Sequence, residues 1–547
     1  MRKLVAVTAA SALACALGGT MTTADASPQP ARHHHHHASA LQRELHGARH
    51  YTPPTLDWGT CDVPRLQSAG AQCAMVTVPL DYAHPHGKKV KLAISRVEHK
   101  SDNDQGVMLV NPGGPGGSGL IYSILGPAIP NNVGADYDWI GFDPRGVGES
   151  KPNLSCDGSY FGYDRPNYVP TTHKLESFWL HKAAGYARKC DKVGGRLLDH
   201  TKSTTWAMDV DMIRKALGEK QINYYGFSYG TYLGQVYATL FPSHVRRMVW
   251  DGVVNPTKVW YQANLDQDKA FDANMTRYFA WIAKHDDVYH LGTTASAVQG
   301  LYYAKLKQLE AQPEAGGKLG PDEWTDAFLS AGYYVYGWED LAQAFSAAIN
   351  DDNWAPMLSA YDAANGAGPG SDNTYANYLA VQCTDTRWPS WPKQRLDNWR
   401  MYGQAPFETW ANAWYNAPCL TWGARPSHPV RVRDRGVPPI LMIAETHDAA
   451  TPFSGALKAR SIFGQSRLIE GVDGTTHAGS LSGVACTDDR IADYLASGKL
   501  DPRKPGDTSD VQCPPVPQPD PGANQMAPQE QRPHMPSDLR HGLVPLR

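Results

Sequence analysis

A serine lies between two glycines near the middle of the chain, in a stretch whose residue types suit nucleophilic catalysis. The segment Gly226-Phe227-Ser228-Tyr229-Gly230 follows the β-prone run INYY and precedes the largely apolar run TYLGQVYATL. A G-x-S-x-G turn between a strand and a helix is typical of serine nucleophiles, because it lifts the hydroxyl above the end of the strand. A side chain at either glycine would crowd so tight a turn. We therefore predict that Ser228 is a nucleophile and that the backbone N–H of Tyr229 stabilises an oxyanion.

A serine hydroxyl is a weak nucleophile, so it needs a base and an acid that orients the base. Two later strand-like runs each precede a suitable residue: Asp448 follows ILMIAE, and His477 follows SRLIEGV. In proteins with this serine turn, the acid and then the histidine follow the serine along the chain. Asp251, Glu445 and Asp473 are competing acids near the same strand ends. The turn DAATP, which directly follows a strand, favours Asp448, and its position alone favours His477.

The loop NPGGPGGSG, residues 111–119, follows a short apolar strand and is rich in glycine. Glycines there let backbone N–H groups approach a reacting carbonyl without a Cβ in the way. The second oxyanion donor of this kind of site comes from the loop after the third strand, so we expect it in this loop. A phosphate-binding loop is the alternative, but the segment lacks both the G-K-[ST] ending and the G-x-G-x-x-G spacing.

The elements that must position these residues alternate between strand and helix. Residues 74–98 alternate between apolar and polar types around a Pro/Gly turn, which predicts two antiparallel strands. Further strands and helices are expected in the segments 106–119, 137–150, 204–218, 222–241, 245–254, 438–445, 466–472 and 488–498. Their alternation predicts the α/β class, with a mostly parallel sheet and helices on both faces, as in the α/β-hydrolase fold.

Changes in composition divide the chain into a core and an insertion. Residues 51–257 and 431–513 carry the alternating pattern and form the predicted core. Residues 258–430 are rich in Trp, Tyr and Ala and predict a large inserted cap that is mainly helical. Residues 514–547 are rich in Pro and Gln, which predicts a disordered tail.

The N-terminus has the features of an export signal. A positively charged start and an apolar run precede the small-residue cleavage site Ala24-Asp25-Ala26, so residues 1–26 predict a secretory signal peptide. Residues 27–50, which include five consecutive histidines, predict a disordered leader or the pro-segment of a zymogen. We expect a secreted, extracellular protein without a membrane span once the signal is removed.

The cysteines agree with export. The sequence has nine cysteines, and loss of Cys15 with the signal peptide leaves eight. An even number in an exported chain indicates disulfides, although eight cysteines can pair in many ways. Pairing of neighbours along the sequence gives Cys61–Cys73, Cys156–Cys190, Cys383–Cys419 and Cys486–Cys513. No C-x-x-C pair and no zinc-like spacing occurs, so we expect no metal ligand among them.

The overall composition excludes some classes of partner. Hydrophobic residues make up 42% of the chain and charged residues 19%, which is ordinary for a globular protein. The formal net charge is only −3 at pH 7, so nothing predicts binding to nucleic acid or to an anionic membrane. We expect a monomer that needs no cofactor.

Several longer stretches resemble a known family. The segments NPGGPGGSG, FDPRGVGES, GFSYGTYLGQVYATLFPSHVRRMVWDGVVNP, WYQANLDQD, HDAATP and TTHAGS are similar to segments of the secreted tripeptidyl aminopeptidases of Streptomyces and other actinobacteria. In the predicted insertion, QCTDTRWP and WANAWYNAPCLTW resemble that family too. The resemblance extends from about Trp58 to Cys513. These enzymes are α/β-hydrolase serine exopeptidases related to proline iminopeptidases.

The resemblance implies the same catalytic roles for matching residues. Ser228 would be the nucleophile, Asp448 the orienting acid and His477 the base. The oxyanion N–H groups would come from Tyr229 and from the glycine loop, where Gly114 matches the second glycine of the related H-G-G-P-G loop.

The resemblance also implies release of short peptides, typically tripeptides, from the free N-termini of peptides and proteins. A carboxylate in the inserted cap would then pair with the substrate ammonium group, and Glu339 and Asp385 are candidates. A proline iminopeptidase or an esterase remains an alternative, because a catalytic triad does not distinguish amides from esters. A non-catalytic binding protein would be expected to lack a member of the triad, and none is lacking.

Overall fold

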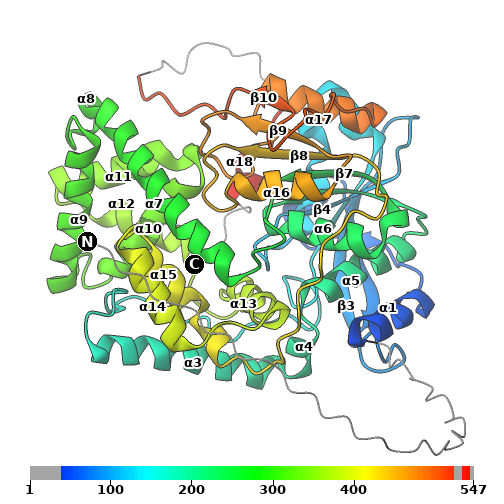
Figure 1. The fold of residues 1–547 in the computed structure, drawn as a ribbon, viewed down its shortest axis with the longest axis horizontal. Coiled ribbons are helices and arrows are strands. Elements are labelled where there is room, and N and C mark those ends of the chain that lie inside the picture. The colour runs from blue at the N-terminus through cyan, green and yellow to red at the C-terminus, as the bar shows by residue number, and fades with distance from the viewer. Residues whose placement is uncertain (1–38, 523–532, 542–547) are drawn as a thin grey trace, which may run out of the picture. The chain divides into compact units, whose positions relative to one another are not determined.

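The computed structural model describes residues 39–522 and 533–541, and this part of the chain is built around a ten-stranded sheet (Figure 1). Strands β1 to β10 span Gly59–Thr60, Gln72–Pro79, Lys89–Val97, Val107–Asn111, Asp138–Phe142, Ile222–Phe227, Val245–Asp251, Ile440–Glu445, Arg467–Gly471 and Val511–Cys513. Their order in the sheet is β1-β2-β3-β5-β4-β6-β7-β8-β9-β10. Pairings from β5 through β10 are parallel, and those among β1, β2, β3 and β5 are antiparallel. The predicted α/β class and the antiparallel pair within residues 74–98 are confirmed.

The helices fall into two groups, those that connect strands and those that gather beside the sheet (Figure 1). Helices α1 to α9 span Ala40–His50, Pro64–Ser68, His173–Gly194, Arg196–Asp199, Ser203–Ala216, Tyr229–Leu240, Tyr261–Lys284, Asp286–Tyr289 and Ala295–Ala311. Helices α10 to α18 span Pro321–Tyr333, Trp338–Asn350, Ala355–Ala364, Asn373–Asp385, Trp391–Tyr402, Thr409–Asn416, Ser454–Ile462, Ala485–Ser497 and Ser537–His541. Short 3₁₀ helices span Leu120–Ile124, Gly126–Ala128, Pro130–Asp136, Pro242–His244, Val335–Gly337 and Ala417–Leu420.

The middle strands are buried on both faces, which explains their continuous apolar sequences. Along β4, Val107 and Leu109 belong to one buried cluster, while Met108 and Val110 belong to another. Helices α5, α6 and α16 contribute to the first cluster, and α17 contributes to the second. Because successive side chains of a strand point to opposite faces, the strands at the centre of the sheet supply both cores.

Helices α7 to α15 lie between β7 and β8, where the sequence predicts the inserted cap. The helical region is larger than the predicted segment 258–430, because α3 also packs against it. Trp179 of α3 and Trp414 of α15 stack with ring centroids 6.0 Å apart, in a cluster that also contains Trp410. Helix α3 comes from the segment 51–257, which the composition assigned to the core.

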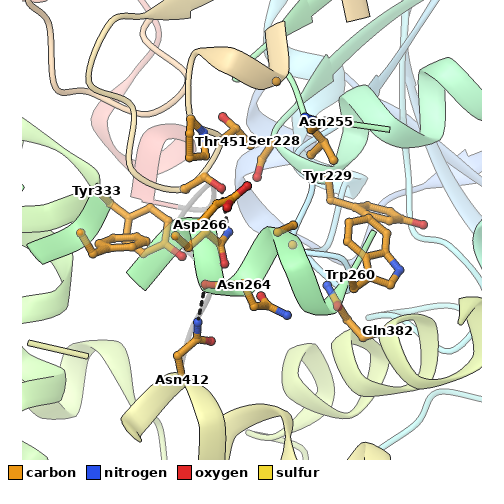
Figure 2. Close-up of a pocket in the computed structure, with 18 of the residues that line it drawn as sticks. Ser228, Tyr229, Asn255, Trp260, Asn264, Asp266, Tyr333, Gln382, Asn412 and Thr451 are labelled. Carbon is orange, nitrogen blue, oxygen red and sulfur yellow. Dashed lines mark hydrogen bonds between the residues drawn. The ribbon is translucent and has the colours of Figure 1, made fainter. Parts of the chain in front are cut away.

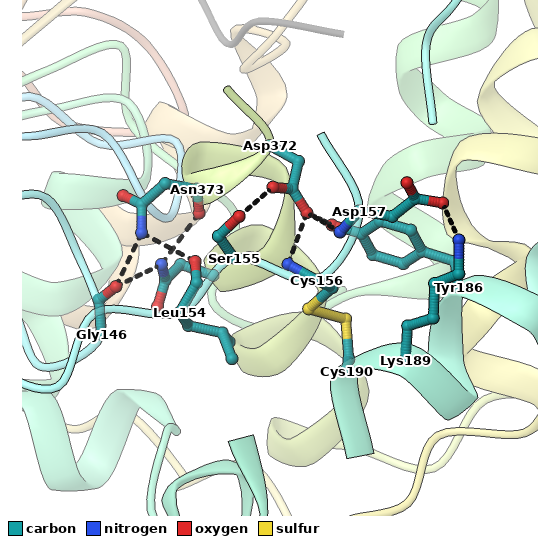
Figure 3. Close-up of a disulfide and its surroundings, with 11 residues drawn as sticks. Gly146, Leu154, Ser155, Cys156, Asp157, Tyr186, Lys189, Cys190, Asp372 and Asn373 are labelled. Carbon is teal, nitrogen blue, oxygen red and sulfur yellow. Dashed lines mark hydrogen bonds and ion pairs between the residues drawn. A yellow bond between two sulfur atoms is a disulfide. The ribbon is translucent and has the colours of Figure 1, made fainter. Parts of the chain in front are cut away.

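The start of α13 is anchored to the loop before α3 by one carboxylate (Figure 3). Asp372 directly precedes α13 and accepts hydrogen bonds from Ser155 Oγ at 2.5 Å and from Tyr186 Oη at 2.7 Å. It also accepts backbone N–H bonds from Cys156 and Asp157, both at 2.7 Å. The charge-assisted bonds tie α13 to the chain segment that follows β5.

The described residues form four disulfides, and their pairing is the one predicted from neighbouring cysteines. The bridges are Cys61–Cys73, Cys156–Cys190, Cys383–Cys419 and Cys486–Cys513. Cys190 lies on α3, so the second bridge fastens this helix to the loop that Asp372 holds (Figure 3).

The N-terminal part of the described chain corrects one prediction. Residues 27–50 are predicted to be a disordered leader or a pro-segment. Residues 40–50 form α1, and Ala48 is buried in a core cluster, so disorder is wrong for these residues, while the pro-segment stays a prediction. The Lys215 ammonium group donates to the carbonyls of Ala48, Arg49 and Tyr51, so the last carbonyl groups of α1 have a partner. The predicted signal peptide and the histidine tract lie outside the described residues.

The predicted disorder of residues 514–547 is also wrong for part of that segment. Met535 and Leu539 are almost fully buried in a core cluster, and α18 begins between them. Met535 and Leu539 are apolar residues that indicate an ordered segment. The composition of the whole tail is dominated by proline and glutamine, so it predicts disorder instead. In the described part of the chain, no helix combines the length and the apolar character that crossing a bilayer requires.

Candidate active site

Ser228 occupies the sharp turn between β6 and α6. Its backbone has φ 54° and ψ −126°, a strained conformation that places the side chain at the end of the strand. A Cβ on Gly226 would approach the carbonyl oxygen of Gly230 to 2.6 Å, and a Cβ on Gly230 would approach that of Asn111 to 2.5 Å. Both glycines are therefore required for close packing. The backbone N–H of Ser228 donates to Asp251 O at 2.9 Å, which fixes the turn against β7.

Asp448 and His477 form a buried pair on the turns after β8 and β9. Nδ1 of His477 lies 2.8 Å from Oδ2 and 3.0 Å from Oδ1 of Asp448, and both side chains are fully buried. The carboxylate also accepts the backbone N–H of Thr451 at 2.8 Å and its hydroxyl at 2.7 Å. A carboxylate held in this way orients the imidazole and favours the proton on Nδ1, which makes Nε2 the basic nitrogen.

The histidine ring is held beside the serine turn. A Cβ on Gly252 would lie 2.8 Å from Cε1 of His477, so the ring packs directly against the residue that follows β7. Nε2 is buried and has no hydrogen-bond partner among the described residues, and none joins it to the Ser228 hydroxyl. In enzymes without substrate such a contact is often long and tightens when substrate binds. The arrangement is compatible with a general base that accepts the proton of the Ser228 hydroxyl when substrate binds.

The glycine loop after β4 touches the serine turn, as an oxyanion site requires. A Cβ on Gly113 would lie 2.6 Å from the carbonyl oxygen of Phe227 and 2.8 Å from Cβ of Ser228. The N–H of Gly113 is used within the loop, where it donates to Asn111 Oδ1 at 3.1 Å. Gly114, the next residue, lines the same cleft as Ser228 and Tyr229. The predicted pair of donors, Gly114 and Tyr229, is therefore brought together.

The loop is also supported from the helical region. A Cβ on Gly116 would lie 2.4 Å from the carbonyl oxygen of Thr374, within α13. Because Asp372 anchors the start of α13, the glycine loop rests on a helix that is itself tied to the Cys156–Cys190 bridge.

The competing acids have other contacts. Asp251 accepts the N–H of Ser480 at 2.8 Å, and burial raises its pKa to about 6. Glu445 accepts the N–H groups of Thr476 at 2.5 Å and Val516 at 2.6 Å, and burial raises its pKa to about 8. Both acids hold the chain around the histidine rather than its ring. The contacts favour Asp448 as the orienting acid.

A cleft extends from Ser228 between the core and the helical region (Figure 2). Its lining includes Trp260 and Asn264 near the start of α7, Gln382 on α13 and Asn412 on α15. Nδ2 of Asn264 and Oε1 of Gln382 are buried and have no hydrogen-bond partner among the described residues. Buried polar groups are normally paired, so both side chains would have to turn toward the cleft to meet a ligand there.

One buried carboxylate lines this cleft and was not predicted. Glu408 directly precedes α15, and the residue is 2% exposed. The signal was available in the sequence, because Glu408 lies two positions before the segment WANAWYNAPCLTW that carries the resemblance. The segments WYQANLDQD and QCTDTRWP likewise supply Trp260, Asn264 and Gln382.

The two acids predicted to bind the substrate amine lie elsewhere. Asp385 is buried behind the cleft, where it accepts Ser203 N at 2.7 Å and Trp260 Nε1 at 3.1 Å. Burial raises its pKa to about 6. Glu339 is half-buried on α11, near the Tyr289 hydroxyl. Neither residue lines the cleft, so the structure does not bring them together with the serine.

Comparison with known proteins agrees with this geometry. A model of the α/β-hydrolase fold family matches residues 106–478. The chain is 42% identical to a tripeptidyl aminopeptidase of Streptomyces lividans over 472 residues, which cover 84% of this chain and 87% of that protein. It is 30% identical to the serine protease Hip1 of Mycobacterium tuberculosis, over 82% of this chain and 90% of that protein. It is also 30% identical to carboxylesterase B of the same organism, over 82% and 89% of the two chains.

Proposed function

The chain belongs to the α/β-hydrolase fold family, and within it we propose that it is a serine aminopeptidase, which releases short peptides from free N-termini. Tripeptides are the proposed product, because the relative from Streptomyces lividans is a tripeptidyl aminopeptidase. The substrates would be peptides and proteins. The observation that carries the proposal is the buried Glu408 carboxylate in the cleft that contains Ser228.

The proposed reaction starts at the serine hydroxyl. Nε2 of His477 takes the proton of Ser228 Oγ as this oxygen attacks the scissile carbonyl, and Asp448 stabilises the imidazolium that forms. The N–H groups of Tyr229 and Gly114 stabilise the oxyanion of the tetrahedral intermediate. His477 then gives its proton to the leaving amine, and a peptidyl ester remains on Ser228. Water, deprotonated by the same histidine, releases the short peptide and restores the serine.

Recognition of the N-terminus would come from the helical side of the cleft. An α-ammonium group carries a positive charge, and a carboxylate in a site sheltered from water binds it far better than one in bulk solvent. Glu408 is the proposed partner. Asn264 and Gln382 line the same cleft, and their amide groups are candidates for contacts with the substrate backbone.

Secretion is part of the proposal. The charged start, the apolar run and the Ala24-Asp25-Ala26 site support a signal peptide, and the segment after it supports a zymogen. N-terminal sequencing of the protein recovered from culture medium tests both. A start at Ser27 would indicate signal cleavage alone, and a later start would indicate removal of a pro-segment. Retention of the intact chain inside the cells would contradict secretion.

An esterase is the second candidate, favoured by the likeness to a carboxylesterase. Three substrates distinguish the two: a tripeptidyl nitroanilide with a free N-terminus, its N-acetylated form, and a simple aryl ester. A peptidase of the proposed kind releases the intact tripeptide from the first and acts poorly on the second. Efficient ester hydrolysis without release of tripeptide would overturn the proposal.

A further inference from the structure

Helix α7 of the helical region borders both the cleft and the turns that carry Asp448 and His477. Its first half lines the cleft, through residues that include Asn264 and Phe271. Its second half carries Asn274, a residue that is 1% exposed and whose amide group contacts the backbone of both turns. The contacts of this amide therefore bear on how the proposed acid and base are held.

The amide nitrogen of Asn274 lies close to three backbone carbonyls from three separate segments. Nδ2 is 2.9 Å from His447 O, 3.1 Å from Gly332 O and 3.4 Å from Thr475 O. An amide group has two hydrogens, so the two shorter contacts are the main hydrogen bonds. At the other end of the amide, Arg277 donates to Oδ1 at 3.4 Å. Carbonyls at one end and a donor at the other fix which atom is the nitrogen.

These three carbonyls lie beside the proposed catalytic pair. Those at 2.9 Å and 3.4 Å belong to residues one position before Asp448 and two positions before His477, respectively. The third belongs to the residue before Tyr333, and the carbonyl oxygen of Tyr333 accepts the N–H of His477 at 2.8 Å. One buried amide on α7 thus joins the acid turn, the histidine turn and the segment that holds the histidine backbone.

We propose that Asn274 is a positioning residue, which keeps the turns of Asp448 and His477 at a fixed spacing. The inference rests on the proposed function, in which the acid orients the histidine and the histidine takes the proton of Ser228. The 2.8 Å contact between Nδ1 and the carboxylate joins two turns from different strands, so it requires both turns to stay in register. A displacement of about 1 Å at a reacting group can lower the rate by about a hundredfold.

Arg277 gives α7 a second contact with the acid turn. Its Nη2 lies 3.1 Å from Nδ1 of His447, while Asn274 holds the carbonyl of the same residue. Arg277 is only half-buried, so its replacement disturbs less packing than replacement of Asn274. Loss of the guanidinium should therefore have a weaker effect of the same kind.

Three variants test the proposal. Asn274→Leu keeps the approximate size of the side chain and removes the amide, and Arg277→Met removes the second contact. The matched control is Asn398→Leu, because Asn398 is also buried in the helical region and its amide donates to Gln394 O within its own helix.

Two measurements separate positioning from recognition of substrate. The first is kcat and KM for a tripeptidyl nitroanilide. The second is the rate constant for modification of Ser228 by a short-chain alkyl fluorophosphonate. This probe needs the histidine as base, but it carries no peptide and so does not depend on recognition of the N-terminus.

Asn274→Leu should lower kcat by about ten- to a hundredfold with little change in KM, and the fluorophosphonate rate constant should fall in the same proportion. Arg277→Met should show a smaller fall in both quantities. Asn398→Leu should keep the wild-type value of both, even if its thermal unfolding midpoint is lower. This pattern would support a positioning role, because general loss of stability would affect the control as well.

A folded Asn274→Leu variant that reacts with the fluorophosphonate at the wild-type rate would overturn the proposal, and so would an equal loss in Asn398→Leu. If Asn274→Leu does not fold, Arg277→Met decides, and wild-type values of kcat and of the fluorophosphonate rate constant in that variant overturn the proposal. If the wild type reacts with the fluorophosphonate but does not cleave the tripeptidyl substrate, the proposed function fails and the fluorophosphonate rates still test Asn274. If the wild type is not modified at Ser228, both proposals fail.

Discussion

The proposed catalytic residues and the residues of the cleft meet at Ser228, but different contacts hold them in place. Ser228 and Asp448, the proposed nucleophile and orienting acid, sit on turns after strands, where backbone N–H groups take part in the contacts that hold them. Ser228 is fixed by N–H donation to Asp251 O, and Asp448 by the N–H of Thr451. On the helical side, Asn412 donates to Asp268 Oδ1 at 2.8 Å, and side chains of separate helices hold one another.

This difference has a consequence for what each region can tolerate. A turn built on backbone contacts keeps its shape when a side chain changes, so substitutions there should alter the chemistry and leave binding intact. In the helical region the side chains are positioned by contacts with other side chains. Substitutions there should therefore alter the binding of substrate and the rigidity of the helices. The predictions below test this contrast in order of the expected effect on activity.

Ser228→Ala should lower kcat by about 10⁵- to 10⁶-fold, the scale for loss of a triad nucleophile. The N–H bond to Asp251 and the packing of both glycines remain, so the thermal unfolding midpoint should stay close to that of the wild type. Burst and steady-state kinetics on a tripeptidyl nitroanilide measure the first quantity, and calorimetry measures the second. Turnover near the wild-type rate would contradict the assignment of the nucleophile.

Asp448→Asn should lower kcat by about 10⁴-fold, because the amide favours the wrong tautomer of His477. The matched variant is Asp251→Asn. Asp251 is a buried acid at the end of the neighbouring strand, and its carboxylate accepts the N–H of Ser480. Its effect on kcat should be much smaller, since it does not touch the imidazole. Should Asp251→Asn prove the more severe of the two, Asp251 and not Asp448 would be the orienting acid.

The same contrast between local backbone contacts and contacts among distant helices explains which parts of the structure could be predicted from the sequence. The elbow around Ser228 and the glycine loop have short local signatures, because close backbone approach demands glycine. The four disulfides agree with the prediction because each joins cysteines that are neighbours along the sequence. The sheet and its two cores could be predicted from strand–helix alternation for a similar reason.

The partner for the substrate amine could not be predicted in this way. Glu408, Glu339 and Asp385 are all acids in the inserted region, and no local pattern tells which one faces the cleft. The answer depends on how nine helices pack, which is set by contacts far apart in the sequence. The sequence did not predict the ordered helix α18, because its two buried residues, Met535 and Leu539, lie within a segment whose composition is typical of disorder.

Glu408→Gln should lower kcat/KM by about 10²-fold for a peptide with a free N-terminus, through loss of a partly desolvated ion pair. The N-acetylated peptide has no ammonium group, so its low kcat/KM should not fall further. Raising the pH through the pKa of the substrate amine, about 8, should weaken binding in the wild type but not in the variant. Equal losses on the free and acetylated peptides would show that Glu408 does not bind the amine.

The control for this prediction is Glu339→Gln, the acid that sequence reasoning proposed and that lies outside the cleft. It should leave kcat/KM for the free peptide at the wild-type value. A hundredfold loss in this variant would restore Glu339 as the candidate.

The smallest effect on activity is expected from the disulfides, and two of them form a matched pair. Cys156–Cys190 closes a sequence separation of 34 residues and Cys486–Cys513 one of 27, so their loss should reduce the free energy of unfolding by similar amounts, about 3–4 kcal/mol each. Replacing each pair by serine and measuring chemical unfolding checks this equality.

The two variants should differ in catalysis, because their bridges lie in the two regions compared above. The Cys156–Cys190 loop is held by Asp372 at the start of α13, and Gly116 of the glycine loop rests on that helix. Loosening this contact should misplace an oxyanion donor part of the time and lower kcat by less than about tenfold, a fraction of the loss expected for removing a donor outright. The Cys486–Cys513 bridge joins α17 to the edge strand β10, so its loss should leave kcat unchanged. If both variants lose equal stability and equal activity, the position of the glycine loop does not depend on the helical region. The proposed contrast between residues held by backbone contacts and residues held by side-chain contacts would then be wrong for this loop.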